Sequence, residues 1–271
     1  MAFKDLLLLI GEGTEAGNRY GLWLANICGA KLTAVSPPVK RPPTFFAPEM
    51  PGDILDHIRE EAERAPRDAL HAFTERAAQV EVTVETLMLD VASRDISSEI
   101  SRLARYFDAS ILQQPHPEGT ETSWIIEAVL FGSGRPVFIV PYNHNPTQLK
   151  TVLIAWDGGL PAFRAVQEAL PVLTMADRVE VVTVNGGTSG RNRPTDDLAR
   201  HLARHGIRVE QKRISHGDIN VANALLSYAD DGSADLLVMG GYGHSRLREI
   251  VLGGTTRTIL QSMTLPVLMA H

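Results

Sequence analysis

Four short apolar segments occur twice in this sequence, in the same order, and this repeat limits the possible folds more than any other feature. Residues 5–10, 80–89, 108–114 and 135–142 resemble 151–156, 207–214, 235–241 and 265–271, at offsets of 127 to 146 residues. Between them lie longer segments, such as 161–176 and 218–231, with apolar residues at helical spacing. Apolar strands that alternate with helices are typical of a parallel sheet covered on both faces. The repeat therefore predicts an α/β protein made of two similar doubly wound domains.

Proline-rich segments mark the domain boundary and one long loop. Residues 141–150, PYNHNPTQLK, separate the two copies, so we expect domains at 1–143 and 150–271. A length of 271 residues suits two domains of ordinary size. Residues 37–53 are rich in proline and interrupt the first copy, which predicts a long surface loop.

Composition argues against several classes of protein. Acidic residues outnumber Lys and Arg by 32 to 26, which disfavours nucleic acid as a partner, since phosphate binding needs excess basic residues. The single cysteine excludes a disulfide framework. The apolar run near residue 8 is too short for a signal peptide or a membrane span. We therefore expect a soluble cytoplasmic protein without a membrane partner.

Residues 239–256, MGGYGHSRLREIVLGGTT, gather two glycine clusters and a threonine pair between a predicted strand and a predicted helix. Glycines at 240 and 243 would let the backbone approach a ligand closely, and residues 244–252 would form an arm around it. The helix that follows would present free N–H groups to a phosphate at Gly253, Gly254, Thr255 and Thr256. Asp157 ends the first strand of the same copy, where a carboxylate can accept hydrogen bonds from a ribose or an adenine edge.

The spacing G-x2-G-x9-G at Gly240, Gly243 and Gly253, together with Asp157, resembles the ATP-binding type of universal stress protein domain. The resemblance covers almost the whole chain as two tandem copies. It implies, in each copy, a five-stranded parallel sheet of order 3-2-1-4-5 with helices on both faces. The implied ligand is ATP, with ADP or AMP as alternatives, accompanied by Mg²⁺.

The same resemblance assigns further residues to the ligand. Ala155 and Trp156 would lie beside the adenosine held by Asp157, Val184 would pack near the adenine, and Met239 would line the nucleotide. Two positions depart from the family pattern. Gly254 stands where the family has Ser or Thr, and Gly159 stands where it has the Ser of Asp-x-Ser. The first departure predicts weaker discrimination between ATP and ADP.

The first copy lacks these ligand residues. Its aligned positions hold Gly11 in place of Asp157, Gln113 in place of Gly240, and His116 in place of Gly243. No threonine pair opens its last helix, which begins near residue 123. We therefore interpret the first domain as a degenerate copy whose role is to pack against the second, as paired subunits do in single-domain relatives.

Four other motifs have simpler interpretations. GEGTEA at 11–16 fits a dinucleotide fingerprint, but two glutamates there would face the pyrophosphate, and the next strand lacks the acid that binds a ribose. GHSRL at 243–247 lacks the last glycine of a nucleophile elbow, which makes Ser245 a hinge residue. His201 and His205 are spaced to share a metal, but without a third ligand a solvated helix face is favoured. Asp157 and Asp218 also have an interpretation as helix caps.

Two functions remain open from the sequence. The favoured one is an adenine-nucleotide-binding regulatory or stress-response protein that uses its second domain, either alone or as a homodimer. The alternative is an interaction module of the same fold that binds a protein or another small ligand. We assign no catalytic or metal-binding residue. Because the chain has no P-loop lysine and no evident general base, any ATP hydrolysis should be slow.

Overall fold

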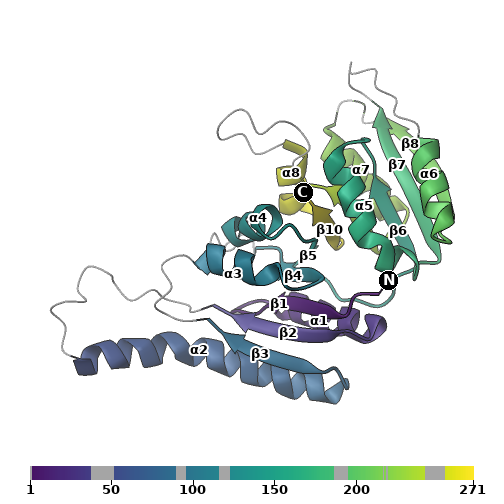
Figure 1. Cartoon of the computed structure of the whole chain (residues 1–271). Helices are drawn as coiled ribbons and strands as arrows, with labels where there is room; N and C mark the ends of the chain where they lie inside the picture. Colours follow the sequence, from purple (N-terminus) through teal and green to yellow (C-terminus); the bar gives the residue numbers. More distant parts are fainter. Residues whose placement is uncertain are drawn as a thin grey trace.

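The computed structural model describes residues 2–37, 52–89, 96–115, 123–185, 195–215, 217, 219–241 and 254–271. Strands and helices alternate along both halves of the chain (Figure 1). The elements of the first half are β1 (Asp5–Leu9), α1 (Glu15–Cys28), β2 (Lys31–Ser36), α2 (Gly52–Gln79), β3 (Val84–Met88), α3 (Ile96–Ala104), β4 (Ala109–Gln113), α4 (Ser123–Gly132) and β5 (Val137–Val140). The elements of the second half are β6 (Thr151–Ala155), α5 (Leu160–Leu173), β7 (Arg178–Asn185), α6 (Thr195–Arg204), β8 (Val209–Ser215), α7 (Val221–Asp231), β9 (Leu236–Gly240), α8 (Gly254–Ser262) and β10 (Val267–Ala270).

All of these strands belong to one ten-stranded sheet of order β3-β2-β1-β4-β5-β10-β9-β6-β7-β8. Within each half the order is the 3-2-1-4-5 that the sequence resemblance implied, and every pairing is parallel. The halves meet where β5 pairs with β10 in the antiparallel direction, with Phe138 opposite Leu268. The expected pair of sheets is therefore one continuous sheet.

One pair of aspartates illustrates how the repeat builds each half. Asp108, just before β4, accepts hydrogen bonds from the N–H groups of Lys4 and Asp5 at 2.7 and 3.1 Å. Asp235, just before β9, accepts from Lys150 and Thr151, both at 2.8 Å. Each carboxylate thus ties the start of its fourth strand to the start of its first. The shared bond explains why an Asp precedes both strands in the sequence.

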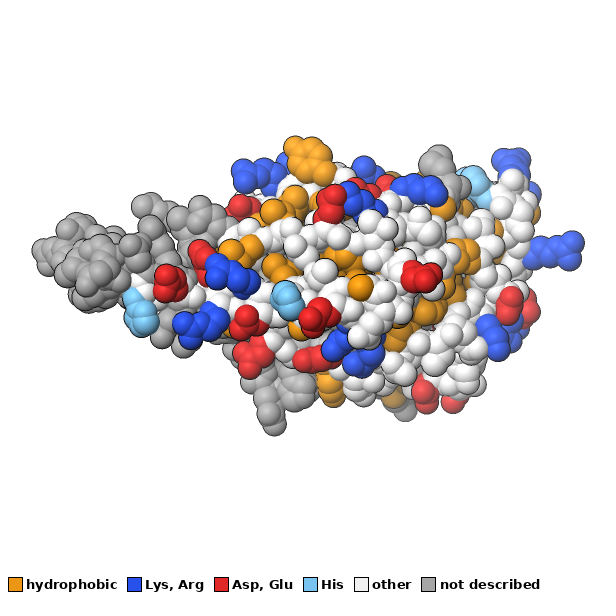
Figure 2. Space-filling view, turned by 90° about the horizontal axis from the view of Figure 1, so that it is seen from below, with side chains coloured by type: hydrophobic (Ala, Val, Ile, Leu, Met, Phe, Trp, Pro, Cys, Tyr) orange, Lys and Arg blue, Asp and Glu red, His pale blue; other side chains and the backbone are white. Residues whose placement is uncertain are grey.

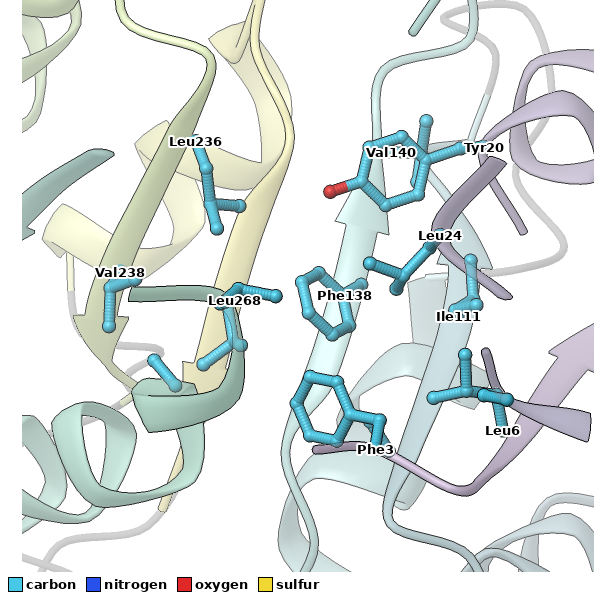
Figure 3. Packing of buried hydrophobic residues seen from close by; sticks show 14 of the residues in the cluster. Phe3, Leu6, Tyr20, Leu24, Ile111, Phe138, Val140, Leu236, Val238 and Leu268 are labelled. Atoms are coloured by element: carbon cyan, nitrogen blue, oxygen red, sulfur yellow. The ribbon is translucent and has the colours of Figure 1, made fainter. Parts of the chain in front are cut away.

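Helices cover the sheet on both faces, and each face has its own apolar core. One core packs beneath α1, α2, α5 and α6, and the other beneath α3, α4, α7 and α8. Both cores run across the β5–β10 junction. Figure 3 shows Phe138 of β5 beside Leu268 of β10, with Phe3 packed edge-on to Phe138 at a ring distance of 5.9 Å. Apolar burial thus continues through the point where the halves join.

Local details differ from the sequence expectations at two places. The predicted loop 37–53 ends earlier, because Gly52 and the next residue already belong to α2, and residues 38–51 lie outside the described part. The cap of α7 is Asn220, whose side chain accepts the N–H of Asn223 at 2.8 Å, and not Asp218. Asn220 immediately precedes the helix, so its side chain reaches this N–H from the N-cap position, whereas Asp218 lies two residues earlier.

Two further observations concern the surface. None of the described helices combines the length and apolar character that a bilayer crossing requires. Figure 2 shows a face on which acidic and basic side chains are interspersed, with apolar side chains exposed between them. On this face the described residues form no extended area of one charge sign. A nucleic-acid-binding surface would be expected to show such an area, of positive charge.

Candidate functional site

The carboxyl ends of β6 and β9 lie side by side in the second half, because Ala155 pairs with Met239 in the parallel register. A helix that connects parallel strands must run back along the sheet, so α5 and α8 both begin at this same edge. The fold therefore brings together the end of β6, the end of β9 and the N-terminus of α8. These are the segments on which the sequence places its ligand residues.

Asp157 follows β6 and is exposed, with its carboxylate held in a fixed direction. Its Oδ1 accepts the N–H of Gly159 at 2.7 Å. Gly158 between them has φ of 71°, a left-handed conformation that favours glycine. Gly159, and not Asp157, is the N-cap residue of α5. One carboxylate oxygen thus orients the group, and no bond to Oδ2 occurs within the described residues, which suits that atom to accept from a ligand.

Gly240, at the end of β9, is required by the packing of α5. A Cβ at this position would lie 2.4 Å from the backbone N of Ala162 and 2.7 Å from the carbonyl carbon of Pro161. Those atoms belong to the first turn of α5, which cannot rotate away as a side chain could. The glycine therefore has a structural cause that is independent of any ligand.

Gly241 has a second close neighbour, which the sequence reasoning missed. A Cβ here would lie 2.8 Å from Cδ2 of Leu130, a residue of α4 in the first half. The only sequence signal for this contact is the doubled glycine at 240 and 241. No local pattern can indicate a partner that is more than a hundred residues away in the sequence.

The apolar candidates divide between the two faces of the sheet. Ala155, Val184 and Met239 pack with the core beneath α7 and α8. Trp156 packs with the opposite core, beneath α5 and α6. Its indole Nε1 is buried without a hydrogen-bond partner in the described part of the chain. The structure therefore groups the first three residues with α8 and sets the Trp156 side chain apart from them.

The first turn of α8 contains both exposed and buried residues. Gly254 is exposed, and a Cβ built there would meet nothing within 4 Å. Thr255 is also exposed, while Thr256 is buried with only 4% of its surface accessible. Arg257, exposed in the same turn, adds a positive charge. Gly243 and Gly253 lie outside the described residues, so α8 is placed here from Gly254 onward.

The matching edge of the first half is filled by a side chain. Gln113 ends β4 as Gly240 ends β9, and its amide bonds both the loop that follows β1 and the first turn of α1. Its Oε1 accepts the N–H of Gly17 at 3.0 Å, and its Nε2 donates to the carbonyl of Gly13 at 2.5 Å. Thr14 closes the same loop through bonds to Gly11. His116 lies outside the described residues. The amide of Gln113 thus satisfies a carbonyl of the loop that in the second half carries Asp157, and an N–H in the first turn of α1.

The histidine pair lies away from this edge. His201 is on α6 and lies within 2.6 Å of the Gln167 Nε2, and its ring contacts that of His205 at 4.9 Å. Among the residues that the structure describes, no group of three or more His, Cys, Asp or Glu side chains could hold a metal.

Comparison with known proteins matches the second half to a family. Residues 148–271 match the model of the universal stress protein family. The universal stress protein Slr1230 of Synechocystis sp. is 28% identical over 148 residues, which are 53% of this chain and 49% of that protein. The alignment therefore spans about half the length of this curated relative.

Solved structures extend the likeness to the whole chain at the level of fold. A universal stress protein from Archaeoglobus fulgidus DSM 4304 has 17% identity and a TM-score of 0.73, covering 98% of this chain and 97% of that one. A universal stress protein from Pseudomonas aeruginosa UCBPP-PA14, described as putative, has 17% identity and a TM-score of 0.58, with coverages of 99% and 93%. Both halves of the sheet thus have counterparts in these folds.

Proposed function

Because residues 148–271 match the model of the universal stress protein family, we propose that this chain belongs to that family, that its second half binds one adenine nucleotide and that occupancy regulates the protein. ATP is the favoured ligand, with ADP and AMP as alternatives and Mg²⁺ as a companion of the phosphates. We also propose that 1–143 and 150–271 form two domain copies and that the protein acts in the cytoplasm in a stress response.

One observation carries this proposal. The exposed, oriented carboxylate of Asp157 and the exposed first turn of α8 follow β6 and β9, whose carboxyl ends lie side by side at one edge of the second half. A carboxylate accepts from ribose hydroxyls, and a helix N-terminus offers N–H groups and a positive dipole end to phosphate. Thr255 adds a hydroxyl donor. Thr256 is buried, so in this scheme Thr255 and not Thr256 meets the phosphate.

The first half supports the proposal by contrast. Where a nucleotide would approach the end of β4, the amide of Gln113 already bonds Gly13 and Gly17. A ligand would have to displace two hydrogen bonds, and no carboxylate equivalent to Asp157 would compensate, because Gly11 occupies that position. We therefore expect one nucleotide per chain.

The test begins with nucleotide that copurifies with the protein. Acid extraction followed by chromatography would identify it, and calorimetry with ATP, ADP and AMP in the presence of Mg²⁺ would give affinity and stoichiometry. We expect one site per chain. Two equivalent sites would contradict the asymmetry between the halves.

Substitutions locate the site. Asp157→Ala should weaken nucleotide binding, because the ribose loses a charged acceptor, a bond worth about 1.5 to 3 kcal/mol. Asp177→Ala is the matched control, since Asp177 is likewise exposed but precedes β7 at the opposite edge of the sheet. Equal affinities for the two variants would remove Asp157 from the site.

A module that binds a protein partner is the second candidate, and one observation favours it. Leu160 and Phe163, at the start of α5, are 65% and 41% exposed, close in sequence to Asp157. An exposed apolar pair beside a polar edge suits a protein partner. Absence of any adenine nucleotide from the extract, together with no heat on titration, would favour this module.

A further inference from the structure

The junction between the halves reaches the proposed nucleotide site itself. Gln114 and Gly241 occupy equivalent positions, since each donates its backbone N–H to the strand beside it, Gln114 to Val140 and Gly241 to Ala270. Each is then met by the last helix of the other half. Gly241 lies against Leu130 of α4, and Gln114 reaches α8.

Gln114 caps the far end of α8. Its side chain is 4% exposed, and its Nε2 donates to the carbonyl of Leu260 at 2.8 Å. The last four carbonyls of a helix have no partner within the helix, and Leu260 is one of them. A nine-residue helix is too short to be stable without tertiary contacts, so this bond helps to fix where α8 lies.

Gly241, the residue that follows β9, is fixed from several sides. Its N–H donates to Ala270 at 2.9 Å, and its carbonyl lies 2.9 Å from Nδ1 of His271. The His271 ring packs edge-on against Phe131 of α4 at 4.9 Å, and its carbonyl accepts from Arg164 of α5 at 2.7 Å. Two residues of the first half therefore fix Gly241, Leu130 directly and Phe131 through His271.

From these contacts we infer that the first half positions the phosphate-binding parts of the second. Gln114, Leu130 and Phe131 are positioning residues for the nucleotide: Gln114 sets α8, and the other two set Gly241 at the end of β9. This inference rests on the proposed function for its ligand, while the contacts themselves concern the protein without ligand. It gives the half that carries no nucleotide a defined task.

Gln114→Met tests the inference, because it keeps the length of the side chain and removes the donor. We expect the dissociation constant for ATP to rise by about three- to tenfold, the equivalent of one lost hydrogen bond. The rise for AMP should be smaller, since AMP lacks the phosphates farthest from the adenosine. Thr74→Val is the control: it also removes a side-chain bond to a helix carbonyl, that of Leu70 in α2.

The dissociation constant for AMP divided by that for ATP separates positioning from general destabilisation. A lower ratio for Gln114→Met, with Thr74→Val like the wild type, supports the inference. Unchanged affinities, or equal weakening of ATP and AMP, would overturn it. Phe131→Ala should lower the ratio as well, because Phe131 holds the His271 ring that contacts Gly241.

Failure of the proposed function would be visible separately, as wild-type protein that binds no adenine nucleotide. In that case hydrogen exchange of the ligand-free protein decides. Faster exchange of the α8 amides in Gln114→Met, and not in Thr74→Val, supports the positioning role. Equal exchange in α8 for both variants would refute it.

Discussion

Replacing Gly240 by alanine should destabilise the fold even without a ligand. The new Cβ would lie 2.4 Å from the N of Ala162, whereas ordinary contact begins at 3.4 Å, so α5 and β9 must separate by about 1 Å. Added methyl groups in packed sites typically cost about 1 to 3 kcal/mol. Because both obstructing atoms are backbone, we expect the upper end, about 3 kcal/mol. Urea denaturation of the ligand-free protein measures this difference directly.

Gly254→Ala is the matched control, since it makes the same change in the other glycine cluster. A Cβ there meets nothing within 4 Å, and the residue already lies in a helix. Its stability should therefore stay the same or rise by about 0.4 to 1 kcal/mol. If Gly240→Ala proved as stable as Gly254→Ala, the close packing of α5 on β9 would be wrong, and Gly240 would have to be explained by the ligand.

Three more outcomes are expected. Gly254→Ser should restore the hydroxyl that the family has here and tighten ATP more than ADP, by about tenfold for each 1.4 kcal/mol gained; equal gains in paired titrations would mean that residue 254 does not face the terminal phosphate. Tyr228→Phe should lower the free energy of unfolding by about 1.5 to 3 kcal/mol, because its hydroxyl donates at 2.8 Å to the buried Glu180 carboxylate, and an unchanged urea midpoint would contradict this. Burial raises the pKa of Asp5 above its ordinary 3.8, because the folded state disfavours the charged form. The resulting loss of folding stability is complete above the folded pKa and vanishes below 3.8. Asp5→Asn should thus be more stable than the wild type at about pH 7, with a difference in urea midpoint that shrinks on acidification; a constant difference would refute the assignment.

The sequence predicted the strands well, because each strand carries its own apolar pattern, and the family resemblance implied their order within each half. The offsets of 127 and 146 residues place Gln113 opposite Gly240 and Gly11 opposite Asp157, and the strand registers agree with both. For the second half, the family resemblance is confirmed by the match over residues 148–271.

Contacts between distant segments escaped the sequence reasoning. Nothing local in β5 or β10 indicates that they pair, so two sheets were expected where one exists. Gly240 was attributed to a ligand, although its nearest neighbours are backbone atoms of α5. In the first half, the Gln113 side chain occupies the edge that matches the proposed site. It does so through hydrogen bonds that residue spacing does not predict. The roles assigned to Gly243 and Gly253 stay predictions, since both lie outside the described residues.

The antiparallel junction has a consequence for the order in which the chain is made. The strand β5 ends at residue 140, but its partner β10 spans Val267–Ala270, near the end of the chain. At about 5 to 20 residues per second, roughly 6 to 26 seconds of synthesis separate the two. Until β10 arrives, a folded first half presents β5, with its apolar residues Val137 to Val140, as an unpaired edge. A nascent or truncated chain that lacks β10 is therefore prone to aggregate, because its exposed β5 edge can pair with a strand of another chain.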